Sequence, residues 1–188
     1  MKKLKSIFIL TLTLIFISCD KNDENTTPVN DETIIGTWSL ISFDATSEFS
    51  GEVLGFPINN ASTSIGENFD YTITFTETEY TVQGGYDLVT TGTINGIPFD
   101  EDRRSFSALD QAGTYSLSDD GALTIDGQLV DIESNDVDLT DIPVDQSVSA
   151  TFNADGNLEL TVNTDLSIDQ AGIPFSITND TKMIFERL

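Results

Sequence analysis

Tyr71-Thr72-Ile73-Thr74-Phe75-Thr76 is the stretch that decides the fold class of this chain. Aromatic or aliphatic residues alternate there with threonine, and a two-residue period is typical of a strand with one buried face. The pattern resumes in Glu79-Tyr80-Thr81-Val82 after the polar corner Glu77-Thr78. The two runs predict β-strands on both sides of that corner.

Similar runs fill most of the chain from Ile34 onward. They cover residues 86–94, 114–117, 123–125, 129–132, 148–152, 158–162, 175–177 and 182–187. Two Asp-Gly turns, at residues 118–121 and 153–157, separate such runs, and glycine supplies the positive φ of a tight hairpin. No window carries a helical stripe longer than a turn or two. About ten strands over about 155 residues predict one all-β domain.

Four prolines of this region stand between apolar neighbours, in Phe56-Pro57-Ile58, Ile97-Pro98-Phe99, Ile142-Pro143-Val144 and Ile173-Pro174-Phe175. Proline has no N–H and keeps its predecessor extended, so these positions suit the entry to a strand or an edge strand. The alternative is that the apolar loops gather at one end of the domain as a portal or docking rim.

The N-terminus has the parts of a secretory signal: three lysines, an apolar run over residues 7–17, and then Ser18-Cys19-Asp20. That run is well short of the ~20 residues that cross a bilayer, which argues against a transmembrane anchor. Phe16-Ile17-Ser18-Cys19 resembles the lipobox of bacterial lipoproteins, in which the cysteine is diacylated and becomes the new N-terminus. The resemblance implies that residues 1–18 are a signal peptide and that Cys19 is lipidated.

Residues 19–33 are expected to be the lipidated cysteine and a flexible tether, because residues 20–33 are polar, acidic and without apolar periodicity. Asp20-Lys21-Asn22-Asp23-Glu24 resembles the export tags of surface lipoproteins in the Bacteroidota. The expected location is therefore the outer membrane, through the N-terminal lipid, and the tag implies exposure at the cell surface.

Gly36-Thr37-Trp38 opens the first expected strand, and Arg187 stands near the end of the last. Lipocalins and fatty-acid-binding proteins share a Gly-x-Trp in the first strand and an arginine in the last strand that packs over the tryptophan. Over residues 34–188 the chain resembles the lipocalin-like (calycin-type) lipoproteins of the Bacteroidota. The resemblance implies an antiparallel lipocalin-like β-barrel of about 8–10 strands. In that barrel Gly36, Trp38 and Arg187 are structural, joined by a cation–π contact.

The charge of the chain excludes two classes of partner. With 8 Lys and Arg against 32 Asp and Glu, the net charge is −24. Such a field repels nucleic acid and anionic headgroups. Arg103-Arg104 is a basic pair, but the neighbouring Asp100, Glu101 and Asp102 are expected to neutralise it in a polar loop.

The residue types also limit the chemistry. The chain has no histidine, and its single cysteine is expected to carry lipid, so His- and Cys-dependent catalysis and ordinary zinc sites are absent. Nothing singles out one pair of carboxylates, and we expect no enzyme activity and no cofactor. Residues 135–141 space their acids as calcium ligands can be spaced, but the glycine and terminal glutamate of an EF-hand are missing, and an ordinary strand is the simpler interpretation.

The sequence therefore predicts a cell-envelope lipoprotein whose barrel binds a small apolar or amphipathic ligand. The predicted ligand-binding residues are Tyr71, Phe75, Tyr80 and Tyr86. The alternative is a structural or protein-interaction module of the outer membrane surface, in which the same aromatic residues fill the barrel and leave no cavity. Its protein partner is not indicated by the sequence.

Overall fold

The computed structural model describes residues 27–53, 55–118, 121–126, 148–170 and 173–188. It contains one short helix, α1 (Asp31–Ile34), and strands that run along the sheet one after another. The strands are β1 (Thr27–Pro28), β2 (Gly36–Val53), β3 (Phe56–Phe75), β4 (Glu79–Ile94), β5 (Ile97–Leu117), β6 (Ala122–Ile125), β7 (Val148–Phe152), β8 (Leu158–Gln170) and β9 (Ile173–Arg187).

All strand pairings are antiparallel, and they close into a ring. The order is β1-β7-β6-β5-β4-β3-β2-β9-β8, and a further pairing of β7 with β8 joins the two ends, so that β2 to β9 form an eight-stranded barrel. β1 adds to the outside of β7. The prediction of an all-β antiparallel barrel is therefore confirmed.

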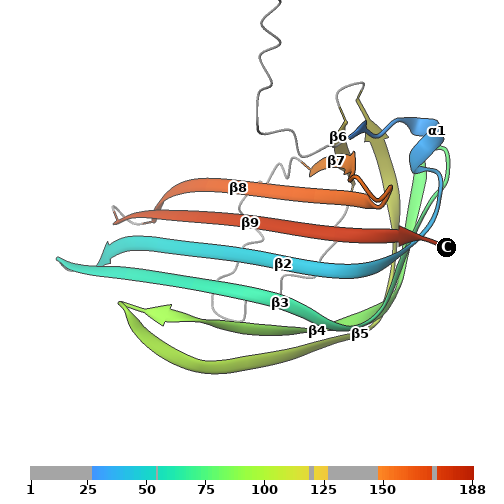
Figure 1. Cartoon of the computed structure of the whole chain (residues 1–188). Helices are drawn as coiled ribbons and strands as arrows, with labels where there is room; N and C mark the ends of the chain where they lie inside the picture. The colour runs from blue at the N-terminus through green and yellow to red at the C-terminus, as the bar shows by residue number, and fades with distance from the viewer. Residues whose placement is uncertain (1–26, 54, 119–120, 127–147, 171–172) are drawn as a thin grey trace, which may run out of the picture.

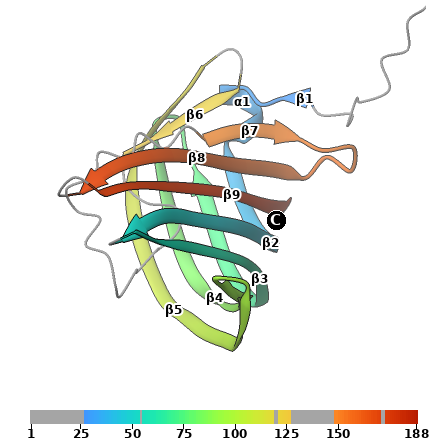
Figure 2. The same ribbon diagram turned by 90° about the vertical axis from the view of Figure 1, so that its left-hand side faces the viewer.

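In the part of the chain that the structure describes, the barrel closes at one end only. β6 and β7 have 4 and 5 residues, whereas β2, β3, β4, β5, β8 and β9 have 13 to 21. We call the part that includes β6 and β7 the closed end. Beyond it the six long strands continue as one curved sheet, the distal sheet (residues 44–53, 56–66, 88–94, 97–106, 163–170 and 173–182), shown in Figures 1 and 2. Among the described residues, β5 and β8 are its two edges.

The hydrophobic core fills the closed end. Alternate residues of the strands point into it, and Tyr71, Ile73 and Phe75 of the sequence run that predicted the fold are all at most 1% exposed. Burial of this apolar surface is the main source of stability. The other large members of the core are Trp38, Leu40, Phe43, Tyr80, Val82, Tyr86, Tyr115, Leu123, Leu158, Leu160, Met183 and Phe185.

Irregular residues mark the junction between the closed end and the distal sheet. The register shifts between Leu40 and Ser42 of β2, between Glu67 and Asp70 of β3, and between Gly84 and Tyr86 of β4. Asn68 and Ala108 have positive φ angles of 53° and 58° at this level. Bulges bend and twist a strand, so these residues redirect the sheet where the barrel ends.

Two features of the sequence interpretation need correction. The tether was predicted to reach residue 33, but the structure describes residues from Thr27 onward and places part of this segment on the barrel. Asn30 caps α1 by accepting a hydrogen bond from the Thr33 backbone N–H, and Val29 and Ile34 are buried in the core. Two apolar side chains on a capped turn are enough to hold this segment on the barrel. Residues 19–26 lie outside the described residues.

Residues 44–69 contain none of the strand runs recognised in the sequence, and the lengths of the strands were generally underestimated. The structure places these residues in the distal parts of β2 and β3. They are rich in Ser, Thr, Asn and Gly, so the hydrophobic alternation that predicts a strand is weak there, although backbone pairing continues.

Three of these prolines confirm the first interpretation, in which proline suits the entry to a strand. Pro57, Pro98 and Pro174 are each the second residue of a strand, at the entry to β3, β5 and β9. The hairpins β2–β3, β4–β5 and β8–β9 all turn at the distal end, on the left of Figure 1, whereas α1 and the C-terminus lie at the closed end. The proline loops therefore do gather at one end. Pro143 and the predicted strand 129–132 lie outside the described residues.

Candidate functional site

The four aromatic residues predicted to bind a ligand lie in the closed end, where they pack against one another and their neighbours. Tyr71, Phe75 and Tyr80 are each 1% exposed and Tyr86 is 3% exposed. Tyr71 meets Tyr86 edge-on at 5.7 Å between ring centroids, and Phe75 lies 6.5 Å from Tyr80. Their role as ligand contacts stays a prediction, but this packing supports a structural role.

The protonation of these tyrosines fits that environment. Burial, and then the neighbouring Tyr86 and Tyr80, raise the pKa of Tyr71 far above its usual range. Burial also raises the pKa of Tyr80 and Tyr115. The phenols therefore remain neutral and offer no acid–base chemistry near neutral pH. The Tyr115 hydroxyl donates a hydrogen bond to the Thr76 carbonyl oxygen, which holds the β3–β4 corner.

Gly36, Trp38 and Arg187 come together as the resemblance implied. The Arg187 guanidinium carbon lies 5.2 Å from the centroid of the Trp38 ring, and Arg187 Nη2 donates to the Ile35 carbonyl oxygen at 2.7 Å. The indole Nε1 donates to the Ile34 carbonyl oxygen at 2.8 Å. A Cβ atom on Gly36 would lie 3.0 Å from Arg187 Nη2. This cluster lies at the closed end of the barrel, where its contacts are structural.

The inner face of the distal sheet, which continues the core face of the barrel, carries a different set of side chains. The register aligns them in rows across the strands. A polar row lies nearer the closed end, and the next row outward is mainly apolar. The polar row is Thr164, Asn179, Ser47, Ser62 and Gly92; the apolar row is Leu166, Ile177, Phe49, Asn60 and Ile94.

Charge is sorted between the two faces of the distal sheet. Among inner-face side chains that the structure describes, only Asp102 and Arg104 of β5 are charged, and they pair with each other at 2.9 Å. The outer face carries acids on β2, β5, β8 and β9, among them Asp44, Glu101, Asp165 and Asp180, and Arg103 and Lys182 also point outward. The distal parts of β3 and β4 have no charged residue on either face. The inner face is thus a neutral surface on a chain of net charge −24.

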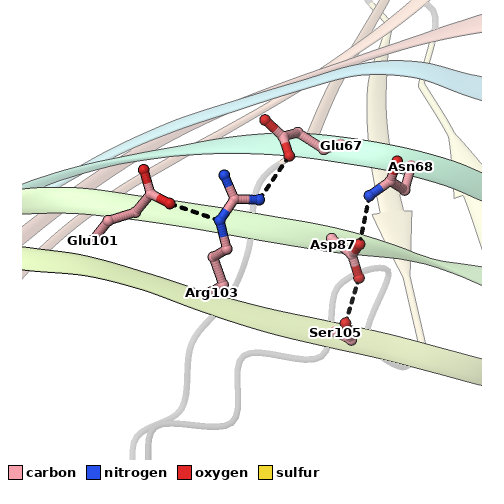
Figure 3. A network of polar contacts seen from close by, with 6 residues as sticks. All are labelled: Glu67, Asn68, Asp87, Glu101, Arg103 and Ser105. Atoms are coloured by element: carbon pink, nitrogen blue, oxygen red, sulfur yellow. Dashed lines mark hydrogen bonds and ion pairs between the residues drawn. The ribbon is translucent and has the colours of Figure 1, made fainter.

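The outer face holds a network of polar contacts over β3, β4 and β5 (Figure 3). Arg103 pairs with Glu67 at 2.9 Å and with Glu101 at 2.6 Å. Asp87 accepts hydrogen bonds from Ser105 and from Asn68, which lower the pKa of its carboxyl group.

The network joins three strands, and the ion-paired side chains Arg103, Glu67 and Glu101 are about half exposed, so each ion pair is expected to contribute little to stability. Arg103 and Arg104 are neutralised by acids as predicted, but they lie within β5 and not in a loop.

Two hollows lie in the distal half of the molecule. One, of about 430 Å³, is lined mainly by outward-facing residues of β2, β8 and β9, such as Glu52 and Ser167. The other, of about 300 Å³, is lined mainly by outward-facing residues of β2, β3, β4 and β9, such as Glu48 and Ala61, together with Asn60. The Oδ1 atom of Asn60 is buried and has no hydrogen-bond partner among the described residues. Sequence reasoning missed this region because its hydrogen-bonding residues are ordinary Ser, Thr and Asn.

Within the described parts of the chain, no group of three or more acidic, histidine or cysteine side chains is arranged to hold a metal ion. The candidate calcium stretch, residues 135–141, lies outside them. No helix among the described residues is long and apolar enough to cross a membrane. No protein-family model, curated protein or solved structure matches this chain.

Proposed function

We propose that this protein is a cell-envelope lipoprotein, anchored to the outer membrane through Cys19, whose lipocalin-like domain binds a small, uncharged apolar or amphipathic molecule. The proposed binding surface is the inner face of the distal sheet, not the aromatic core. The observation that carries the proposal is the sorting of charge: the inner face is neutral, although about one residue in five of the chain is charged.

The size of the surface suits such a ligand. Six strands spaced by about 4.8 Å make a trough roughly 24 Å wide, and Figure 2 shows it curving from β5 to β8. The apolar row would contact the hydrophobic part of the ligand. The polar row, with the unpartnered Asn60 Oδ1, would hydrogen-bond to its polar groups. A concave, mostly apolar surface with a few polar groups is the usual form of a small-molecule site.

Neighbouring residues of β3 provide the test. Ser62 is half-buried on the inner face, whereas Thr63 is exposed on the outer face. We expect Ser62→Asp to weaken binding of the uncharged dye N-phenyl-1-naphthylamine at least about tenfold, because a carboxylate loses solvation in an apolar complex. Thr63→Asp should leave binding unchanged, and Ser62→Asn should retain most of it.

The measurement is a fluorescence titration of the full chain and its variants, with melting temperatures checked for each. The apolar segment at residues 7–17 is common to all of them, so it does not affect the comparison. If the dye does not bind, or binds both aspartate variants equally, the ligand proposal fails. The alternative, an envelope module without a ligand, would then be the better account.

A further inference from the structure

The hairpins at the distal end carry a second uncharged region, which adjoins the outermost row of the inner face at Ile94. We call the exposed ends of these hairpins the hairpin tips, formed by residues 55–58, 94–98 and 174–175. Each carries the pattern Gly-Phe/Ile-Pro-Ile/Phe, at Gly55, Gly96 and Gly172. Phe56 and Ile97 are 73% and 71% exposed, and Ile94 is 50% exposed. Large apolar side chains gathered on one exposed end usually mark a contact surface.

The sequence around the tips contains no charge. Residues 53–66, 88–99 and 170–179 have no Asp, Glu, Lys or Arg, in a chain that contains 40 such residues among 188. The nearest acids in the sequence are Glu52, Asp100 and Asp169, and Glu52 is paired across the strands with Pro57 of one tip. A protein interface normally keeps charged residues at its rim. The interfacial layer of a bilayer, in contrast, accepts aromatic and aliphatic side chains and disfavours charge.

Two of the tips are tied into a single surface. The Asn95 backbone N–H donates to the Asn59 carbonyl oxygen at 2.7 Å, and the Asn59 backbone N–H donates to Asn95 Oδ1 at 2.8 Å. Gly55 and Gly96, which make the turns with φ angles of +82° and +78°, would have no atom within 4 Å of an added Cβ. The tips therefore project freely, and their exposed Phe56 and Ile97 are presented together.

We propose that the hairpin tips bind to the surface of a lipid bilayer with zwitterionic headgroups, placing Phe56 and Ile97 in its interfacial layer. The net charge of −24 opposes contact with anionic lipid or with a second copy of the chain, and neutral tips remove that repulsion at the point of contact. The tips and α1 lie at opposite ends of the described structure (Figure 1).

The test uses the single cysteine of the chain. In the full chain with Cys19→Ala, Phe56→Cys and Ile97→Cys each accept one environment-sensitive dye. Ile65→Cys and Ile41→Cys are the matched controls, because these isoleucines are also exposed, at 51% and 43%, but lie away from the tips. Each labelled protein is mixed with phosphatidylcholine vesicles, and vesicles with brominated acyl chains report the depth of the dye.

We expect the dyes at residues 56 and 97 to shift to shorter wavelength and to be quenched by the brominated chains, whereas those at residues 41 and 65 remain unchanged. Phe56→Ser should reduce the vesicle affinity reported at residue 97 by about tenfold, because it removes one inserted aromatic ring. Adding phosphatidylglycerol to the vesicles should weaken the response at low salt.

Three results would overturn the proposal. The first is that the dyes at residues 56 and 97 do not respond to vesicles. The second is that the dyes at all four positions respond alike, as they would if the segment at residues 7–17 alone held the chain on the lipid. A response at residue 97 that depends on protein concentration without lipid would instead identify the tips as a contact between copies.

Discussion

Two features of the structure require glycine at position 36. Its φ of 143° lies in the region that favours glycine, and the space where a side chain would begin is taken by the Arg187 guanidinium. Arg187 can therefore lie over Trp38 and hydrogen-bond to the backbone at Ile35. The Gly36-Thr37-Trp38 motif is thus explained by a local cluster at the closed end.

Trp38→Ala is predicted to lower the free energy of unfolding by about 3–5 kcal/mol, because it leaves a large cavity and removes the indole hydrogen bond to Ile34. Ile41→Ala is the control, since Ile41 belongs to the same strand but is 43% exposed. Urea denaturation measures both. A change below about 1 kcal/mol for Trp38→Ala would contradict its placement in the core.

Asp87 gives a pH prediction on the outer face. Hydrogen bonds from Ser105 and Asn68 lower the pKa of its carboxyl group below the ordinary value of 3.8. A folded pKa below the unfolded one means that Asp87 contributes stability above about pH 3.8, and that this contribution is lost as the pH falls through the folded pKa. Carboxyl-carbon NMR titration should give a value below 3.8. A value at or above 3.8 would show that the network of Figure 3 does not form in solution.

At the scale of elements, the junction between the closed end and the distal sheet depends on residues without side chains. Gly84 has a φ of +97°, and an added Cβ would lie 1.5 Å from the Asp70 carbonyl oxygen. Because this neighbour is backbone, it cannot rotate away. The bulged pairing of β3 with β4 is therefore accessible only with glycine at this position.

Gly84→Ala is predicted to destabilise the protein by about 4 kcal/mol or more, through backbone strain and the collision with β3. Gly55→Ala is the matched control: its φ is also positive, at +82°, but open space surrounds it, so only backbone strain of about 1 kcal/mol is expected. Thermal or urea unfolding compares the two. Equal costs would mean that β3 and β4 are not paired through this bulge.

The elements also show what the sequence can predict and what it cannot. Alternation in residues 71–76 and 79–82 identified strands in the core, because one face of each is packed with large apolar side chains. The Asp-Gly turn at residues 153–157 was predicted for a similar local reason, and Gly156 has the expected positive φ of 81°. Residues 44–66 were missed, because much of their inner face is built from Ser, Asn, Gly and Ala, with only a few large apolar residues such as Phe49. Their strand structure depends on pairing with β4 and β9, which no local pattern reveals.

The candidate binding surface could not be predicted for a related reason. The large aromatic residues were predicted to bind the ligand, but in the structure they fill the core of the closed end. The neutral inner face becomes visible only when the register places Ser47 opposite Ser62 and Asn179 and directs the acids of the same strands outward. Gly36, Trp38 and Arg187, in contrast, were correctly brought together from a motif at each end of the domain.

At the scale of the whole molecule, three regions have distinct chemistry: an aromatic core at the closed end, a neutral inner face in the middle, and uncharged hairpin tips at the far end (Figure 1). The outer face carries the acids that keep so acidic a protein dispersed.

Cys19→Ala is predicted to abolish the lipid anchor. The native protein should partition into the detergent phase of a Triton X-114 extraction and carry a diacylglyceryl group detectable by mass spectrometry. The variant should carry no lipid and remain unprocessed or leave the membrane fraction. A native protein without lipid, or a variant that is processed and retained like the native one, would contradict the proposed anchoring.

The central claim, that the inner face of the distal sheet is the ligand surface, is tested most directly by NMR of the protein with methyl groups labelled and N-phenyl-1-naphthylamine bound. The account predicts nuclear Overhauser effects from the dye to the methyl groups of Ala45, Leu166 and Ile177, which lie on the inner face. It predicts none to Ile65 on the outer face or to Ile73 in the core. Contacts to Ile65 or Ile73 without contacts to the inner face, or no bound dye at all, would contradict it.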